Sequence, residues 1–293
     1  MKTTQFSSLA VFGDGLSDMG RWGNLTNKLY PPAVHGFYES RWTNGKVWIE
    51  HVADSMGMQL NFDNNFALGG ATTGLYNINE ALRPALQLHD SIPLMGMLAQ
   101  VQAYLAGNPA ISNETLFVLW AGGHDIGNLL DYGQPDLEQF PPSENYQTAV
   151  KLLAEAGAKK ILLGTMPDMG FAPVYHGTEK QAIASTLCHS LNDGLKALQQ
   201  AYSTSETQIL LLDGAKIFAE ADANPGKYGF THKDAFLPFD IIDFSRPLEI
   251  VDRTVPNKQM GLNPDEFMNW WAVSASAKMH RIIADEAISL IQQ

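Results

Sequence analysis

The chain has 293 residues, of which 31 are acidic and 19 basic, giving a net charge of −12. Apolar residues make up 45% of it and charged residues 17%, so it can bury a sizeable core, and we expect a soluble, monomeric globular protein. The surplus of carboxylates argues against a nucleic-acid partner, because phosphate binding needs a basic face. No window approaches the roughly 18 apolar residues of a membrane span. A single cysteine, Cys188, excludes an internal disulfide framework.

The first residues do not have the pattern of an export signal. The early apolar run, residues 9–12, is shorter than the roughly 7–15 residues of a signal-peptide core. We interpret it as the first strand of the fold. Two alternatives stay open: a mature form whose leader has been removed, or a protein that is not exported by that route.

Short apolar runs alternate with longer amphipathic stretches, which is typical of a parallel sheet wrapped by helices. This pattern predicts a single domain over residues 1–293. Strands are predicted at 9–12, weakly at 58–62, and at 116–120, 161–164 and 209–212. Helices are predicted at 47–56, 93–106, 145–158, 179–202, 215–221 and 275–293. The stretches at about 15–44 and 226–262 lack periodicity and are expected to be long loops over one face.

Glycine-rich and polar residues follow several of the predicted strands. Parallel sheets bind ligands beyond the carboxyl ends of their strands, so these residues are the candidates for function. They are the segments 14–18, 69–72, 122–125 and 166–170.

At these positions the sequence resembles the GDSL, or SGNH, family of serine ester hydrolases. The segment 11–20, VFGDGLSDMG, is similar to the family's first block, and the segments 65–71, 118–125, 166–173 and 263–280 resemble later blocks in family order. The resemblance runs from residue 9 to residue 290. It implies a flavodoxin-like three-layer α/β/α sandwich with a five-stranded parallel sheet. It also implies hydrolysis of carboxylic esters, lipids and phospholipids among them, by a Ser-His-Asp mechanism.

The same resemblance places other residues where the family has its reacting groups. Gly15 stands at the nucleophilic serine, His124 at the oxyanion asparagine, Trp271 at the triad aspartate and Ser274 at the triad histidine. Gly70, whose N–H faces the oxyanion in the family, is retained. Gly15 offers no nucleophile, and Trp271, which we expect to pack under the last helix, cannot orient an imidazole. The pattern predicts a catalytically inactive protein that can still bind an ester or lipid.

An esterase or phospholipase working through a relocated pair stays open as the alternative. In that case Ser274 would attack the ester and His124 would take its proton. Against this, Ser274 has the pattern of a helix N-cap, and His124 that of an imidazole satisfied by backbone groups. Ser17 is expected to be a turn or N-cap hydroxyl, and Asp14 to shape its own turn.

The sequence predicts neither a cofactor nor a metal site. The histidines lack the spacing of a zinc site, and the glycine pairs at 69–70 and 122–123 lack the nucleotide-binding patterns. The ligand that remains is a small ester or a lipid.

Overall fold

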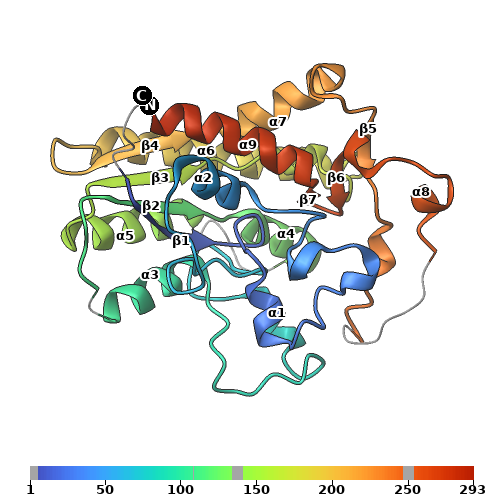
Figure 1. The fold of residues 1–293 in the computed structure, drawn as a ribbon, viewed down its shortest axis with the longest axis horizontal. Coiled ribbons are helices and arrows are strands. Elements are labelled where there is room, and N and C mark those ends of the chain that lie inside the picture. Colours follow the sequence, from blue (N-terminus) through green and yellow to red (C-terminus); the bar gives the residue numbers. More distant parts are fainter. Residues whose placement is uncertain (1–5, 108, 134–140, 247–253) are drawn as a thin grey trace.

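We describe residues 6–107, 109–133, 141–246 and 254–293 in a computed structural model of the chain. Four parallel strands form the central sheet in the order β1-β2-β3-β4 (Figure 1). Their residues are β1 Ser8–Gly13, β2 Thr115–Trp120, β3 Lys160–Gly164 and β4 Gln208–Leu212. Because the strands are parallel, their carboxyl ends all meet at one edge of the sheet.

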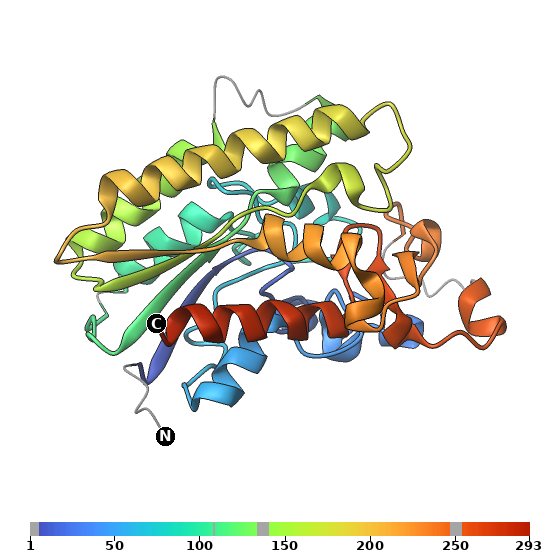
Figure 2. The same cartoon turned by 90° about the horizontal axis from the view of Figure 1, so that it is seen from above.

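Helices cover both faces of this sheet, which confirms the predicted three-layer α/β/α arrangement. Figure 2 shows α3, α5 and α6 on one face and α2 and α9 on the other. The helices are α1 Arg21–Leu25, α2 Trp48–Met56, α3 Met97–Ala106, α4 Gly123–Tyr132, α5 Pro142–Glu155, α6 Gln181–Tyr202, α7 Gly214–Ala223, α8 Pro256–Gln259 and α9 Ala277–Ile291. Short 3-10 turns are η1 Ala33–His35, η2 Tyr38–Ser40, η3 Ile78–Leu82, η4 Met169–Phe171, η5 Pro225–Tyr228, η6 Phe239–Ile241 and η7 Pro264–Glu266. No helix in the described ranges is long and apolar enough to cross a membrane.

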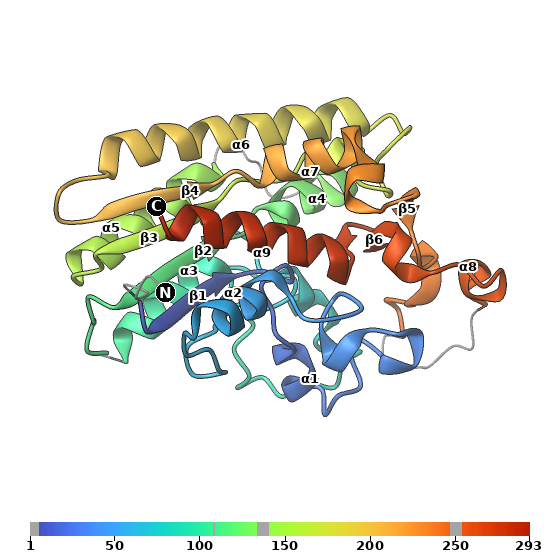
Figure 3. The same cartoon turned by 45° about the horizontal axis from the view of Figure 1, so that its top comes forward.

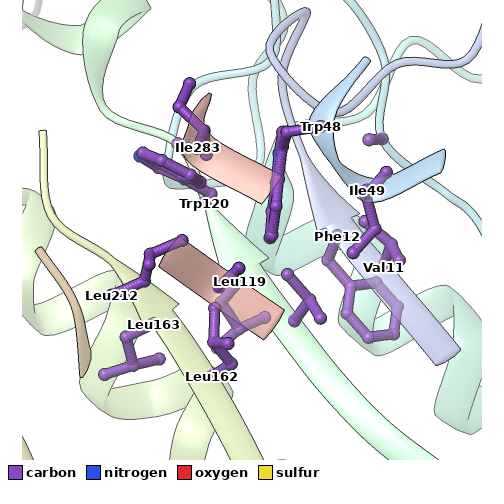
Figure 4. Packing of buried hydrophobic residues seen from close by; sticks show 14 of the residues in the cluster. Val11, Phe12, Trp48, Ile49, Leu119, Trp120, Leu162, Leu163, Leu212 and Ile283 are labelled. Atoms are coloured by element: carbon purple, nitrogen blue, oxygen red, sulfur yellow. The ribbon is translucent and has the colours of Figure 1, made fainter. Parts of the chain in front are cut away.

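The main core lies on both faces of the sheet, between the strands and the helices that cover them. β2 is buried at every position, as expected of a central strand covered on both faces. In Figure 4, Trp120 of β2 packs against Trp48 of α2 and Ile283 of α9. The T-shaped contact between Trp48 and Trp120, with ring centroids 5.2 Å apart, joins α2 to the carboxyl end of β2.

The fifth strand predicted at 58–62 is not formed, which corrects the sequence-based expectation. Only isolated bridges pair this segment with β1, at Gln59 and again at Asn65. Between them the Asn61 N–H donates to Asn64 Oδ1 at 2.7 Å, and the Asp63 N–H donates to Asn61 Oδ1 at 2.8 Å. These side chains compete for the backbone and loop the chain out, so no continuous strand forms.

A small second sheet lies beyond the carboxyl ends of the parallel strands, near the start of α9 (Figure 3). It consists of β5 His232–Ala235, β6 Phe267–Trp271 and β7 Ser274–Ala275. The stretch 226–262 is therefore not purely a loop, since it contains β5 and α8; its residues 247–253 lie outside the described ranges. Likewise 15–44 contains α1, and the last helix begins at Ala277 rather than 275.

A buried ion pair fixes the loop that leads into α2. The guanidinium of Arg41 donates to both carboxylate oxygens of Glu50, at 2.6 and 2.7 Å, and both side chains are less than a tenth exposed. Glu50 also accepts from the Val47 N–H at 2.9 Å, so it closes the start of the helix. The next residue after Arg41 is Trp42, so the pair fixes the backbone from which that indole projects.

We expect Glu50→Gln to lower the free energy of unfolding by about 3–5 kcal/mol, because it leaves the buried guanidinium with only the exposed Glu39, 3.1 Å away, as its counter-charge. Asp54→Asn is the matched control: it breaks the exposed 2.6 Å pair with Lys46 and should cost less than ~1 kcal/mol. Urea denaturation of the two variants measures both values. Similar losses in the two would contradict the assignment.

Candidate functional site

A cleft of about 1170 Å³ opens at the carboxyl edge of the parallel sheet. The segments that follow β1, β2, β3 and β4 all contribute to its wall, as does the turn between β6 and β7. The five residues that the sequence analysis singled out all line this one cleft; they are Gly15, Gly70, His124, Trp271 and Ser274. Segments far apart in the chain therefore converge where a parallel sheet binds its ligands.

An aromatic pair occupies the space beside Gly15. Trp42 and Trp271 stack with ring centroids 5.9 Å apart and an interplanar angle of 17°. A Cβ atom on Gly15 would lie 3.1 Å from Cδ1 of Trp42 and 3.7 Å from Cα of Gly69. A side chain at this position therefore requires Trp42 to shift by a few tenths of an ångström.

Trp271 does not pack under the last helix, which corrects the sequence-based expectation. Its indole N–H donates to the carbonyl of Phe239 at 3.2 Å, and its ring contacts Phe37 and Phe244 in a second, aromatic core beneath the loops. The partner Trp42 lies in the loop before α2, far from Trp271 in the sequence. No local pattern in the sequence reveals such a stack.

Gly70 lies in a turn that only glycine can form. Its φ is +82°, and a Cβ atom would collide with the side-chain amides of Asn77 and Asn79. Those two amides donate to the carbonyl of Gly69 at 3.1 and 3.0 Å, and the indole N–H of Trp22 donates to it at 2.8 Å. The direction of the Gly70 N–H is therefore fixed.

That N–H is already bonded within the protein. It donates to Nε2 of His124, on α4, at 3.3 Å. Burial lowers the pKa of His124 to about 4, so the imidazole is neutral at pH 7. Because Nε2 accepts a hydrogen bond, the hydrogen-bond network assigns the ring proton to Nδ1. The backbone therefore satisfies Nε2 of this imidazole, as the sequence analysis expected, but it does not satisfy Nδ1 in the described residues.

Ser274 and His124 line the same cleft, but no hydrogen bond joins them in the described part of the chain. Ser274 is in β7 and pairs with Trp271 across the tight turn that contains Ala272 at φ +39°. It does not cap the last helix: Ser276 does, accepting from the Met279 N–H at 3.3 Å. The N-cap prediction for Ser274 was wrong by two residues.

Buried hydroxyl and imidazole groups around the cleft also have structural partners. The Oγ of Ser17 is fully buried and accepts from the indole N–H of Trp48 at 3.0 Å, so the predicted turn bond to a backbone N–H is replaced by a side-chain one. His280 was not predicted as part of the site but lines the cleft. Its Nδ1 accepts from the Trp48 N–H at 3.1 Å, and burial lowers its pKa to about 3.

Three buried carboxyls hold the loops of this edge. Asp14 accepts from the Leu16 N–H at 3.0 Å, as expected for a residue that shapes its turn. Asp18 accepts from the Gly69 N–H at 3.0 Å, and Asp125 accepts from the N–H and hydroxyl of Thr73 at 2.8 and 2.7 Å. Burial raises the pKa of Asp14 to about 7, with further contributions from the charges of Asp125 and Asp18.

The mouth of the cleft carries large apolar side chains that are 45–78% exposed. They come from the loop before η3, the end of α4, η4, the η6 region and the β6–β7 turn. They are Tyr76, Tyr132, Phe171, Phe239, Phe244 and Val273. Exposed apolar groups that gather at one opening are typical of a ligand-binding surface.

The raised pKa of Asp14 predicts a pH-dependent stability. A carboxyl whose pKa is about 7 in the folded chain and 3.8 when unfolded takes up a proton on folding, so the contribution of Asp14 to stability rises as the pH falls through 7. We expect Asp14→Asn to remove a rise of up to roughly 1.4 kcal/mol per pH unit below 7. Thermal melts at pH 8 and pH 6 measure the difference. Asp54→Asn, on an exposed carboxyl, should differ from wild type by the same amount at both pH values; an Asp14→Asn variant that also differs from wild type by the same amount at pH 8 and pH 6 would refute the assignment.

Comparison with known proteins gives consistent matches over this frame. The thermolabile hemolysin of Vibrio parahaemolyticus is 25% identical over 98% of this chain and 64% of its own length. The phosphatidylcholine-sterol acyltransferase of Aeromonas hydrophila is 28% identical over 77% of this chain and 64% of its own length. The acetylesterase of Thermothelomyces thermophilus is 26% identical over 75% of each chain. This chain thus matches slightly less than two thirds of the first two relatives.

A solved structure shares the fold. The crystal structure of a member of the lipolytic protein G-D-S-L family from Veillonella parvula superposes with a TM-score of 0.52 at 14% identity, covering 98% of this chain and 99% of the other. The sequence profile of the family described as GDSL-like Lipase/Acylhydrolase matches residues 9–287. Since that match spans nearly the whole chain and its blocks build the cleft, the protein belongs to the GDSL-like lipase/acylhydrolase family.

Proposed function

We propose that this protein is a non-catalytic member of its family, whose cleft binds an apolar ester or lipid and does not hydrolyse it. The observation that carries the proposal is at Gly15: a roomy cleft is retained, but the residue beside Asp14 has no side chain and its space borders a tryptophan stack. The proposal takes residues 1–293 as one domain, because the cleft draws on both sheets, and it takes that domain to act as a monomer.

The chemistry of acyl transfer supports this proposal. It needs a nucleophile, a base within hydrogen-bond reach, a group that orients the base, and free donors for the oxyanion. At the positions where the family has these groups, Gly15 offers no oxygen and the indole of Trp271 is no proton acceptor. The Gly70 N–H, the one retained donor, already donates to His124.

The alternative, a relocated Ser274–His124 pair, has less support. Nε2 of His124 is engaged by the Gly70 N–H, and a pKa near 4 makes the imidazole a weak base at neutral pH. No hydrogen bond links the Ser274 hydroxyl to this ring in the described ranges.

Two further observations favour an apolar ligand. The cleft mouth carries the exposed apolar side chains described above. One of the relatives is named as a phosphatidylcholine-sterol acyltransferase, so its name refers to a phospholipid and a sterol. A ligand of this class would place its chain along the aromatic wall and its polar group near Gly15.

Purified protein should show no hydrolysis of a short p-nitrophenyl ester above a boiled control, and no covalent labelling by a fluorophosphonate. The reason is that Gly15 provides no oxygen to acylate or phosphonylate. Ser274→Ala serves as the control for the relocated pair. Stoichiometric labelling that disappears in Ser274→Ala would replace the non-catalytic proposal by the relocated one.

Restoring the family's groups should restore activity only when all are present. As single substitutions, we expect no ester hydrolysis from Gly15→Ser, His124→Asn, Trp271→Asp or Ser274→His, because an unactivated serine is a poor nucleophile. Together they should raise ester hydrolysis by orders of magnitude, since an orienting aspartate is worth up to ~10⁴ in rate and an oxyanion donor roughly 10²–10³.

The structure indicates where this experiment needs a control. Trp271→Asp removes one half of the stack with Trp42 and could cost several kcal/mol, but it also frees the room that a side chain at residue 15 requires. The quadruple variant must therefore give a cooperative melt before its rate is interpreted. A folded quadruple variant without activity on short esters would contradict the assignment of these four positions.

A further inference from the structure

The inner end of the cleft has a distinctive polar composition. Gly15, Gly70 and His124 meet there, and the retained backbone donor is consumed by the imidazole. The Nδ1–H of His124 has no hydrogen-bond partner in the described part of the chain, although the residue lines the cleft. The Nδ1–H of His124 is therefore one fixed donor that a ligand meets here, beside the indole N–H groups of Trp42 and Trp120, which also line the cleft without a partner in the described residues.

The charged groups around this donor are acidic. Asp14 lies next to Gly15, Asp125 next to His124, and Asp18 under the Gly69 turn; each is less than a tenth exposed. The lysines of the cleft are on other elements, namely Lys196 on α6, Lys216 on α7 and Lys233 on β5. Two of them already have carboxylate partners, Asp193 and Asp222, at 3.2 and 3.1 Å.

The pKa of Asp14 indicates how a carboxylate on a ligand would be affected at the same place. Its pKa is raised first by burial and then by the charges of Asp125 and Asp18. A ligand carboxylate beside Gly15 would lose its hydration in the same way and face the same negative charges. An uncharged oxygen would suffer neither penalty.

We propose that the inner end of the cleft selects an uncharged head group: the Nδ1–H of His124 donates to an oxygen of an intact ester, and the acidic surroundings exclude the free carboxylic acid. This inference rests on the proposed ester- or lipid-binding function and adds which form of the ligand is held. The protein would therefore bind an intact ester but not the carboxylic acid that hydrolysis of that ester gives. His124 acts in this proposal as a specificity-determining residue.

The test uses a matched pair of probes, methyl decanoate and sodium decanoate, which differ in the charge of the head group. Binding at pH 7.5 is followed by the fluorescence of the cleft tryptophans Trp42, Trp120 and Trp271, with calorimetry as a second readout. We expect the ester to bind at least tenfold more tightly than the carboxylate. Equal binding, or tighter binding of decanoate, would overturn the inference while leaving a lipid-binding cleft. Binding of neither probe would overturn the proposed function as well.

Variants at His124 separate selectivity from a structural role. His124→Ala should weaken ester binding about tenfold, whereas His124→Asn, which keeps a side-chain N–H donor, should stay within about threefold of wild type. His89→Ala, in an exposed loop away from the cleft, is the matched histidine control and should leave the binding of both probes unchanged. If His124→Ala binds both probes as wild type does, the role assigned to His124 is wrong.

The tautomer of His124 provides a readout that does not depend on any ligand. Nitrogen-15 chemical shifts should identify a neutral ring with the proton on Nδ1 at pH 7, because Nε2 accepts from Gly70. A cationic ring, or a proton on Nε2, would contradict the proposed donor. His124 is the residue to assign, with the exposed His89 as a reference resonance in the same sample.

Discussion

The hydrogen bond from the Gly70 N–H to Nε2 of His124 joins two rigid parts of the cleft. On one side, three donors on the Gly69 carbonyl and the positive φ of Gly70 leave that N–H a single direction. On the other, α4 begins directly after β2, and Asp125 ties it to Thr73. With both sides fixed, the imidazole can accept this bond only as a neutral ring. Burial keeps the ring neutral, and its tautomer and the donor that it presents to the cleft then follow from that contact.

In the proposed non-catalytic protein, the aromatic stack of Trp42 and Trp271 fills the space beside Gly15 in place of a polar network. A buried polar network that has lost some of its members is worse than an apolar core, because each orphaned group keeps its desolvation cost. Here a glycine and two packed indoles occupy the region instead of a partly satisfied network. The exchange is incomplete, since the buried indole N–H groups of Trp42 and Trp120 have no partner in the described ranges. Both residues line the cleft, where a ligand oxygen could accept from them.

Much of the frame could be predicted from sequence because its signals are local. The apolar runs of β1 to β4 and the amphipathic α2 and α6 were predicted within a few residues, and five ordered blocks brought Gly15 and Ser274 to one cleft. What failed depends on tertiary contacts or on competing local bonds. The segment around Gln59 loops out through asparagine side chains, α4 begins on glycines without a capping side chain, and β5 pairs with a strand distant in sequence. The order of the sequence blocks located the site. Its chemistry depends on the contacts of His124 with Gly70 and of Trp271 with Trp42, which sequence spacing does not reveal.

The carboxyls that hold the loops also determine what the cleft can bind. Asp18 fixes the Gly69 turn, Asp125 fixes the start of α4, and Asp14 shapes the turn that carries Gly15. None of these bonds belongs to a nucleophile, a base or an oxyanion donor, so they persist when those groups are absent. Because the three carboxyls are buried, their negative potential is screened little by salt and acts on whatever occupies the inner end. A preference for uncharged head groups is therefore a consequence of how the loops are fixed, and it does not require the protein to be an enzyme.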